Sequence, residues 1–143
     1  MQIKFSKYYA LGNDYIILNP EALDSKNQDM IRKICHRNYG TGSDGILLGP
    51  LQSTIFDFKL RIFNPDGGEA EKSDNGLRIF ARYLWDEELV SHDPFTVETP
   101  GGTVSCEVLS DGRTVKVEMG RVSFNSIDIP VTGASREVLN EAN

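Results

Sequence analysis

The segment from residue 75 to residue 89 constrains the fold more than any other part of the chain, because it predicts a helix with apolar side chains on nearly every side. Such a helix is buried on most of its surface. Arg78 and Arg82 are its only charged residues before Asp86, and each needs a carboxylate or carbonyl partner if it loses water. We therefore expect a sheet wrapped around this helix. Its apolar residues are Leu77, Ile79, Phe80, Ala81, Tyr83, Leu84 and Trp85.

Short strands are predicted for most of the remaining chain. Residues 56–62 alternate between apolar and polar side chains, which is typical of a strand with one buried face. Because strands adjacent in sequence can pair directly, we expect a mostly antiparallel sheet without helical crossovers. The predicted fold class is α+β, with this sheet rolled around one central buried helix. Further strands are predicted at residues 3–5, 15–18, 46–48, 96–99, 104–108 and 115–119, the last three forming a meander.

A second helix is predicted from near Ser25 to residue 37 or 38. Its apolar residues form one stripe, which is typical of a helix that packs on the surface of a core. The pattern fades after Met119. We expect residues 1–120 to form one domain and residues 121–143 to be a connector toward a second domain that this chain lacks. The stripe consists of Met30, Ile31, Ile34 and Cys35.

Composition excludes several functional classes. The chain has 21 acidic and 15 basic residues and a net charge of −6, which argues against nucleic-acid partners. Its apolar runs are far shorter than the roughly 20 residues that cross a bilayer, so no membrane segment is expected. No secretory signal opens the sequence, and a cytoplasmic location follows by default. Cys35 and Cys106 lack the spacing of metal ligands, so we expect no metal and two reduced thiols in the core.

Residues 40–45 have the letters of a dinucleotide-binding G-x-G-x-x-G motif. In nucleotide-binding folds this motif follows a strand and opens a helix. Here the order is reversed, because the glycines follow the predicted first helix and precede a strand. We therefore interpret Gly40 as the C-terminal cap of that helix and expect no nucleotide cofactor.

Residues 64–78 hold the most informative polar cluster. Ser73 stands just before the first turn of the buried helix, where free backbone N–H groups and the helix dipole favour an anion such as a carboxylate. A second interpretation is that Ser73 or Asp74 simply caps the helix, and at this point it is favoured because caps are far commoner than active sites.

Three stretches, residues 5–15, 39–48 and 61–82, together resemble the diaminopimelate epimerase family of cofactor-independent amino-acid racemases. The resemblance implies one of the family's two similar domains, with a substrate cleft between them. The implied activity is isomerisation of LL- to meso-diaminopimelate in lysine and cell-wall biosynthesis. The implied substrate is a small amino acid, and no cofactor is needed.

The resemblance also implies roles for individual residues. Asn13 and Asn64 would hydrogen-bond the amino-acid end of the substrate, and Asp74 and Asn75 would offer donors at the helix start. The family uses two cysteines, one from each domain, as an acid/base pair on opposite faces of the α-carbon. The first of these falls at Ser73 here, and the glycine that follows it falls at Asp74. Ser73 is thus the candidate catalytic residue.

A serine at this position limits the chemistry. A thiol has a pKa of about 8.5, whereas an alcohol starts near that of water, about 15.7. A helix dipole supplies at most about 2 kcal/mol, or roughly 1.5 pKa units. Ser73 therefore does not become a free base, although it can donate or relay a proton.

Because the second cysteine belongs to a domain that this chain lacks, we expect the chain alone to be inactive. Its cleft face is expected to be covered by a second copy, as a homo-oligomer, or by the missing domain. Two alternatives remain open. One is a non-catalytic domain that binds an amino acid or a protein, and the other is a related dehydratase or isomerase of the same fold.

Overall fold

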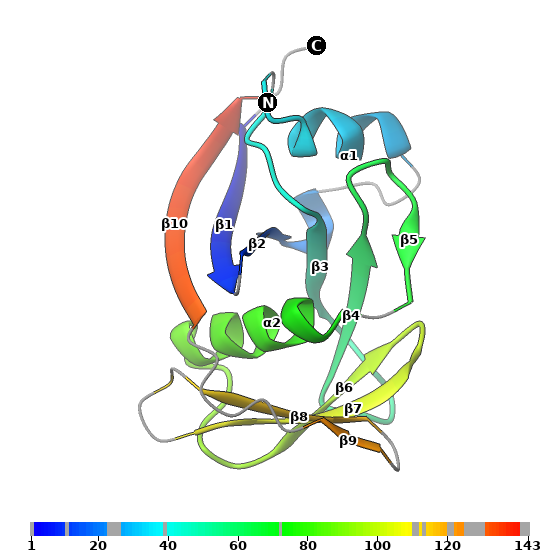
Figure 1. The fold of residues 1–143 in the computed structure, drawn as a ribbon, viewed down its shortest axis with the longest axis vertical. Coiled ribbons are helices and arrows are strands. Elements are labelled where there is room, and N and C mark those ends of the chain that lie inside the picture. Colours follow the sequence, from blue (N-terminus) through cyan, green and yellow to red (C-terminus); the bar gives the residue numbers. More distant parts are fainter. Residues whose placement is uncertain are drawn as a thin grey trace.

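The structure is a computed structural model that describes residues 2–10, 12–22, 27–38, 40–71, 73–109, 112, 114–119, 122–124 and 131–140. Within these ranges it contains two α-helices, one 3-10 helix and ten strands (Figure 1). The strands are β1 (Gln2–Ala10), β2 (Asn13–Leu18), β3 (Ile46–Leu51), β4 (Phe58–Phe63), β5 (Glu69–Ala70), β6 (Phe95–Thr99), β7 (Gly102–Val108), β8 (Val115–Met119), β9 (Val122–Phe124) and β10 (Val131–Asn140), and the helices are η1 (Pro20–Ala22), α1 (Gln28–Cys35) and α2 (Asp74–Asp86).

The described strands form one mixed sheet in the order β10-β1-β2-β3-β4-β6-β7-β8-β9, with β5 paired to β4. The predicted meander is confirmed, since β6, β7 and β8 pair antiparallel in sequence order. The absence of crossovers was a wrong prediction, because β2 pairs with β3, and β4 with β6, in parallel. Parallel neighbours need a long connection, and α1 and α2 lie in those two connections. The fold class is α+β, as the sequence predicts.

Helix α1 is shorter than predicted. It begins after Asn27, whose side chain accepts a hydrogen bond from the N–H of Met30, and Ser25 lies outside the described residues. It ends at Cys35 because the next residue, His36, is extended. Ile31, Ile34 and Cys35 of its apolar stripe are buried, Met30 is half-buried, and its other face is exposed, as expected for a surface helix.

Gly40 is not the C-terminal cap of α1, because His36 holds that position. The chain instead folds back so closely that a Cβ on Gly40 would lie 1.9 Å from the carbonyl oxygen of Lys33. The N–H groups of Gly42 and Ser43 then bond the carbonyls of the last helical turn. The glycines at residues 40–45 thus seat a loop against α1, and they precede β3, an order unlike that of a nucleotide-binding fold.

Helix α2 crosses the molecule between β1–β4 on one side and β6–β8 on the other (Figure 1). Its end differs from the prediction: it stops at Asp86, and Glu88 follows with φ of 60°. The N–H of Leu89 bonds the carbonyl of Leu84, and that of Glu88 bonds Trp85, which is a Schellman motif. The residues from Gly76 to Ala81 and Leu84 are buried, whereas Asp86 is exposed.

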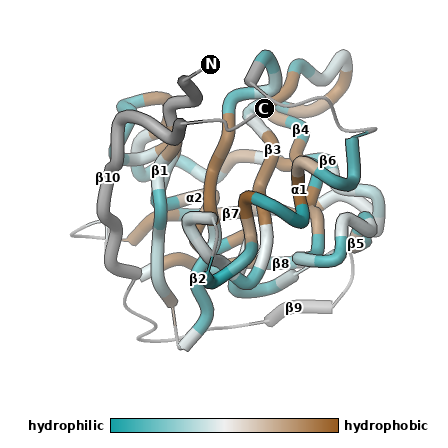
Figure 2. Tube along the Cα trace, turned by 90° about the horizontal axis from the view of Figure 1, so that it is seen from above, coloured by the Kyte–Doolittle hydropathy of each residue, from teal (hydrophilic) through white to brown (hydrophobic). Residues whose placement is uncertain are grey.

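Two hydrophobic clusters hold the described part of the chain together. The larger surrounds α2 with side chains of the flanking strands, and the smaller lies beneath α1. Figure 2 shows hydrophobic segments running through the interior of the molecule. Since about 25 cal/mol is gained per Å² of apolar surface buried, these clusters are the main source of stability. They also fix the first turn of α2 relative to β2 and β3.

Residues 121–143, where a connector was expected, include two of the described strands. The longer of these, β10, pairs antiparallel along the length of β1. The domain boundary at residue 120 stays a prediction. In the described part of the chain, no helix is both long and apolar enough to span a membrane.

Candidate active site at the start of helix α2

Ser73 is the N-cap of α2. Its backbone is extended, with φ of −153° and ψ of 120°, and its Oγ accepts a hydrogen bond of 3.0 Å from the N–H of Gly76. Its carbonyl accepts the N–H of Leu77. The N–H groups of Asp74 and Asn75 lie ahead of the first intrahelical bond, so the helix itself leaves them without acceptors. The capping interpretation of Ser73 is therefore confirmed, and two donors remain for an anion.

A tyrosine hydroxyl lies beside the cap. The Oη of Tyr15, on β2, is 3.1 Å from the Oγ of Ser73. The tyrosine ring is held against Gly45, where an added Cβ would lie 2.8 Å from the ring and 2.7 Å from the carbonyl oxygen of Phe63. Only glycine permits this approach, so Gly45 lets the Tyr15 ring pack closely beside the backbone of β4. Sequence reasoning gave Tyr15 no role.

Two of the predicted substrate-binding asparagines meet at the same place. The Nδ2 of Asn75 donates to the Oδ1 of Asn13 at 2.7 Å. The Nδ2 of Asn13 in turn donates to the carboxylate of Asp44 at 3.2 Å. All three side chains are half-buried. The first turn of α2 is thereby joined to β2 and to the loop that precedes β3.

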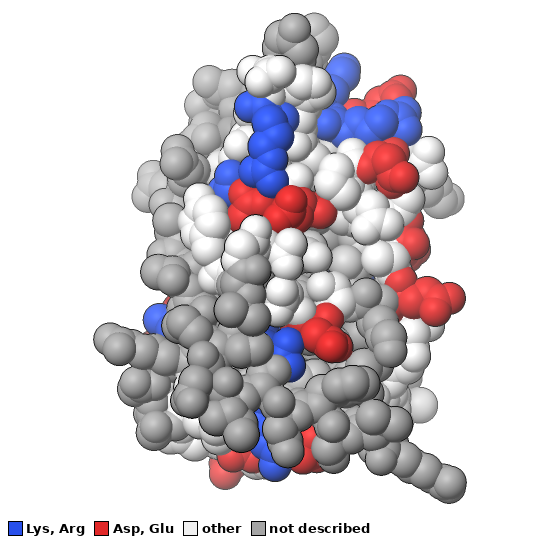
Figure 3. Space-filling view, viewed as in Figure 1, with Lys and Arg blue, Asp and Glu red and all other residues white. Residues whose placement is uncertain are grey.

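Asp44 belongs to a larger charged network. Arg37 binds both oxygens of Asp14 at 2.9 Å and one oxygen of Asp44 at 3.0 Å. The Nζ of Lys7 lies 3.2 Å from Asp14 and donates to the carbonyl of Gly42 at 2.6 Å. Burial alone would raise the pKa of the Asp14 carboxyl, but the hydrogen bonds from Arg37 and Lys7 outweigh it and hold that pKa well below its usual range. Figure 3 shows basic side chains lying directly against acidic ones.

Asn64 is not part of this cluster. It is exposed and opens the turn after β4, where its backbone bonds Gly67 and Gly68. It follows Phe63, whose carbonyl oxygen faces Gly45, so its backbone is close to the site. Its substrate-binding role stays a prediction, as do the roles of Ser73, Asn13, Asp74 and Asn75.

Asp74 and Arg78 lie one turn apart on α2. Asp74 is half-buried, and Arg78 is 3% exposed. The Nε of Arg78 is buried without a hydrogen-bond partner among the described residues. Burial lowers the pKa of Arg78, and the Asp74 charge partly offsets this. Arg82, by contrast, pairs with Asp86 and donates to the carbonyl of Gly112, as the sequence analysis required.

The two cysteines take no part in the site. Both are buried core residues, as predicted. Burial raises the pKa of Cys35, and it raises the pKa of Cys106 to about 12. No group of three potential metal ligands occurs among the described residues.

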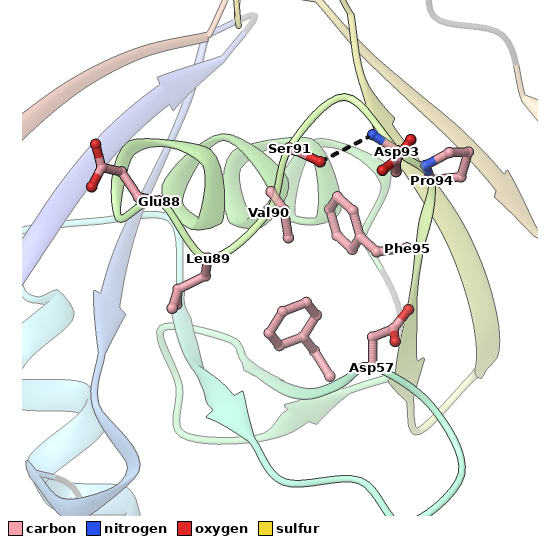
Figure 4. A pocket seen from close by; sticks show the side chains of 9 residues that line it. Asp57, Glu88, Leu89, Val90, Ser91, Asp93, Pro94 and Phe95 are labelled. Carbon is pink, nitrogen blue, oxygen red and sulfur yellow. Dashed lines mark hydrogen bonds between the residues drawn. The ribbon is translucent and has the colours of Figure 1, made fainter.

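A hollow of about 490 Å³ lies at the other end of α2 (Figure 4). The helix has 13 residues and is therefore about 20 Å long, which separates this hollow from Ser73. None of the predicted site residues lines it. The lining residues are Asp57, Phe58, Glu88, Leu89, Val90, Ser91, Asp93, Pro94 and Phe95.

Sequence reasoning missed the groups that hold the site in place. The charged residues Lys7, Asp14, Arg37 and Asp44 are far apart in the sequence and follow no shared periodicity. Asp44 stands within the glycine-rich motif at residues 40–45, next to a predicted strand. That position was the one sequence signal that could have pointed to a role for Asp44 in the site. Pairing of β1, β2 and β3 is what brings these residues together.

The fold is shared with several solved structures, among them an epimerase. A hydroxyproline epimerase from Agrobacterium vitis, solved with bound trans-4-hydroxy-L-proline, superimposes with a TM-score of 0.66 at 14% identity, covering 82% of this chain and 41% of that one. At that identity the likeness concerns the fold alone.

The family model for diaminopimelate epimerase matches residues 5–125, and the chain belongs to that family. "Diaminopimelate epimerase 2" of Nostoc sp. is 61% identical over 140 residues, covering 97% of this chain and 49% of the relative. "Diaminopimelate epimerase" of Halothermothrix orenii is 39% identical over 136 residues, covering 92% and 48%. The chain thus spans about half the length of the curated relatives that it matches.

Proposed function

We propose that this chain is the half of a diaminopimelate epimerase-type isomerase that binds the α-carboxylate of the substrate at the start of α2. The isomerase interconverts LL- and meso-diaminopimelate without a cofactor. In this proposal the sheet rolls around α2 as one of the two family domains, and the substrate lies between them.

The donor cluster at the first turn of α2 is the observation that carries the proposal. The backbone N–H groups of Asp74 and Asn75 lie ahead of the helical ladder, and the amides of Asn13 and Asn75 stand beside them. Donors aimed at a carboxylate stabilise the negative charge that develops when the α-proton leaves. The helix dipole adds to this stabilisation.

Ser73 takes the part of a proton donor or relay in this reaction. Its Oγ already accepts the N–H of Gly76, and Tyr15 lies within hydrogen-bond distance on its other side. A hydroxyl can accept two hydrogen bonds and donate one. When Tyr15 donates to Ser73, the serine proton is left for a ligand at the helix start.

The opposite face of the α-carbon needs a second acid/base group from outside this chain. We therefore expect the 143-residue chain to bind the amino acid but not to invert it. Its site face is expected to self-associate or to pair with a second domain, which sedimentation velocity would detect.

The test joins this chain to the part of the Nostoc relative that it does not match. Inversion of LL-diaminopimelate by this fusion is compared with inversion by the same fusion carrying Ser73→Cys. We expect the cysteine fusion to be at least about a hundredfold faster, because a positioned acid/base group contributes roughly that much or more.

The separate 143-residue chain and a fusion carrying Asn75→Ala serve as controls, and both should show little inversion. The proposal fails if the Ser73→Cys fusion is folded but neither inverts nor binds diaminopimelate. Folding is checked by circular dichroism, and binding by NMR titration of the amide resonances.

The alternative is a non-catalytic domain that binds an amino acid or a protein. The full engagement of Ser73 as a cap favours it, because that geometry needs no further role for the hydroxyl. Absence of inversion by the Ser73, Ser73→Cys and Ser73→Ala fusions, with diaminopimelate still bound, would favour this alternative.

A further inference from the structure

We infer that Asp44 is a positioning residue, which fixes which way the amides of Asn13 and Asn75 face and so makes the start of α2 a site for anions. This inference deepens the proposed function and rests on it only for the identity of the ligand. The orientation of the amides can be tested without any ligand.

The carboxylate of Asp44 lies among three donors. An ionised carboxylate can only accept hydrogen bonds. Asp44 pairs with Arg37 at 3.0 Å, and its Oδ2 also accepts the backbone N–H of Asp14 at 2.9 Å. The third group at this carboxylate is the side-chain amide of Asn13, 3.2 Å from Oδ2. Asn13 must therefore turn its NH₂ group, and not its oxygen, toward Asp44.

The orientation of Asn13 determines that of Asn75. With its NH₂ group on Asp44, Asn13 presents Oδ1 to its neighbour on α2. An amide oxygen only accepts hydrogen bonds, so Asn75 must donate from its Nδ2. The Nδ2 of Asn75 and the Oδ1 of Asn13 are 2.7 Å apart. The charge on Asp44 thus sets the polarity of two amides in a row. One N–H of each amide has no partner among the described residues.

The charged network holds Asp44 in place. Arg37 bridges Asp44 to Asp14, and Asp14 is also bound by Lys7. The N–H of Asp44 bonds both the carbonyl and the side chain of Asp14. Lys7 and Asp14 are buried, so this arrangement has little freedom to rearrange. Donors in a fixed direction need no reorganisation when a negative charge arrives.

The consequence concerns specificity. Each amide keeps one N–H without a partner among the described residues, and these groups together with the backbone N–H groups of Asp74 and Asn75 supply the donors that a carboxylate needs. If Asn13 turned over, its Oδ1 would face the Asp44 carboxylate and its Nδ2 would face the Nδ2 of Asn75, so that acceptor would meet acceptor and donor would meet donor. Asp44 therefore contributes to carboxylate binding without touching the ligand.

NMR of the unaltered 143-residue chain tests the polarity directly. Scalar coupling across a hydrogen bond should connect the side-chain nitrogen of Asn75 with the side-chain carbonyl carbon of Asn13, and the nitrogen of Asn13 with the carboxyl carbon of Asp44. Couplings in the reverse direction, from the nitrogen of Asn13 to the carbonyl carbon of Asn75, would overturn the inference.

Asp44→Asn tests the dependence on Asp44. We expect the side-chain amide resonances of both Asn13 and Asn75 to shift and to exchange faster with solvent. Asp29→Asn is the matched control, because it also removes a carboxylate paired with an arginine, Arg32, on the exposed face of α1. A folded Asp44→Asn variant whose Asn75 resonances match those of the control would contradict the inference.

Titration with diaminopimelate separates this inference from the proposed function. We expect Asp44→Asn to weaken binding about tenfold and Asp29→Asn to leave it unchanged. If the couplings have the expected direction but the unaltered chain binds no diaminopimelate, the proposed function fails and the orientation of the amides stands. If diaminopimelate binds equally to both variants, the positioning role of Asp44 is refuted and the proposed function stands.

Discussion

A cysteine in place of Ser73 would measure how strongly the start of α2 stabilises a negative charge. An unperturbed thiol has a pKa of about 8.5. The helix N-terminus contributes about 0.3–2 kcal/mol, which lowers the pKa by roughly 0.2–1.5 units. The N–H of Gly76 now donates a hydrogen bond to Ser73. That hydrogen bond becomes stronger by about 1 kcal/mol when its acceptor is charged, which lowers the pKa of the thiol by roughly a further 0.7 units.

Two effects oppose this stabilisation. The position is half-buried, which favours the neutral thiol, and the carboxylate of Asp74 lies next in the chain. At a separation of roughly 7 Å and an effective dielectric constant of about 40–80, that carboxylate adds about 0.6–1.2 kcal/mol of repulsion. We therefore expect the pKa of the thiol in Ser73→Cys to be about 7–8. Adding Asp74→Gly should lower it by roughly another 0.5–1 unit.

The assay is a pH titration of thiolate absorbance in the ultraviolet. The protein suits it, because burial raises the pKa of both Cys35 and Cys106, the latter to about 12. The control is Ser91→Cys, at an exposed serine in the loop after α2, whose thiol should keep an ordinary pKa. A thiol at position 73 with a pKa equal to or above that of the control would refute the reasoning. Ser73 would then be only a structural cap.

Three further substitutions test other parts of the structure. Arg78→Met should raise the free energy of unfolding by about 1–3 kcal/mol in urea denaturation, because the buried Nε of Arg78 lacks a partner among the described residues; a loss of stability would contradict this. Glu88→Gly should raise it by about 1 kcal/mol, because Glu88 has a φ of 60°, whereas Glu87→Gly, at a φ of −85°, should give no gain. Asp14→Asn should make the stability fall less between neutral and acid pH. The folded-state pKa of Asp14 is lowered, so the stabilisation by its carboxylate is complete above the unfolded pKa of about 3.9 and is lost as the pH falls below that value. Unfolding midpoints measured from pH 7 to pH 2 would show no change in slope if Asp14 contributes nothing.

The local patterns of the sequence predicted the elements well and their connections less well. Alternation located β4, β6, β7 and β8 but not the two-residue strand β5, and the apolar pattern of residues 75–89 located α2. The parallel pairs β2/β3 and β4/β6 were missed because strand alternation indicates which face is buried but not which neighbour pairs with it. The ends of α1 depend on Asn27 and His36, and that of α2 on Glu88. Such caps depend on backbone angles that hydrophobic periodicity does not report.

The site was predicted to the extent that it is local in sequence. Ser73, Asp74 and Asn75 are consecutive, and a helix start brings backbone donors with it. Asn13 was located through resemblance, and its contact with Asn75 needs the pairing of β1, β2 and β3. The charged residues behind it were missed because their network joins β1, β2 and the segment between α1 and β3, which only the folded chain brings together. Asn64 was placed with the others, yet its backbone hydrogen bonds to Gly67 and Gly68 are those of a turn.

A serine at position 73 leaves a stereochemical signature if the proposed isomerase is completed by a second half with a thiol on the opposite face. That thiolate could remove and return the α-proton on its own face, with the carbanion stabilised by the donors at the start of α2. Inversion also requires proton transfer at the Ser73 face, which an alcohol performs poorly because its pKa lies near that of water. Because the two directions of inversion share one transition state, the serine slows both by the same factor relative to cysteine. The fusion retaining Ser73 should therefore exchange the α-proton of one isomer with deuterated solvent much faster than it inverts it, whereas equal rates would show that Ser73 transfers the proton itself.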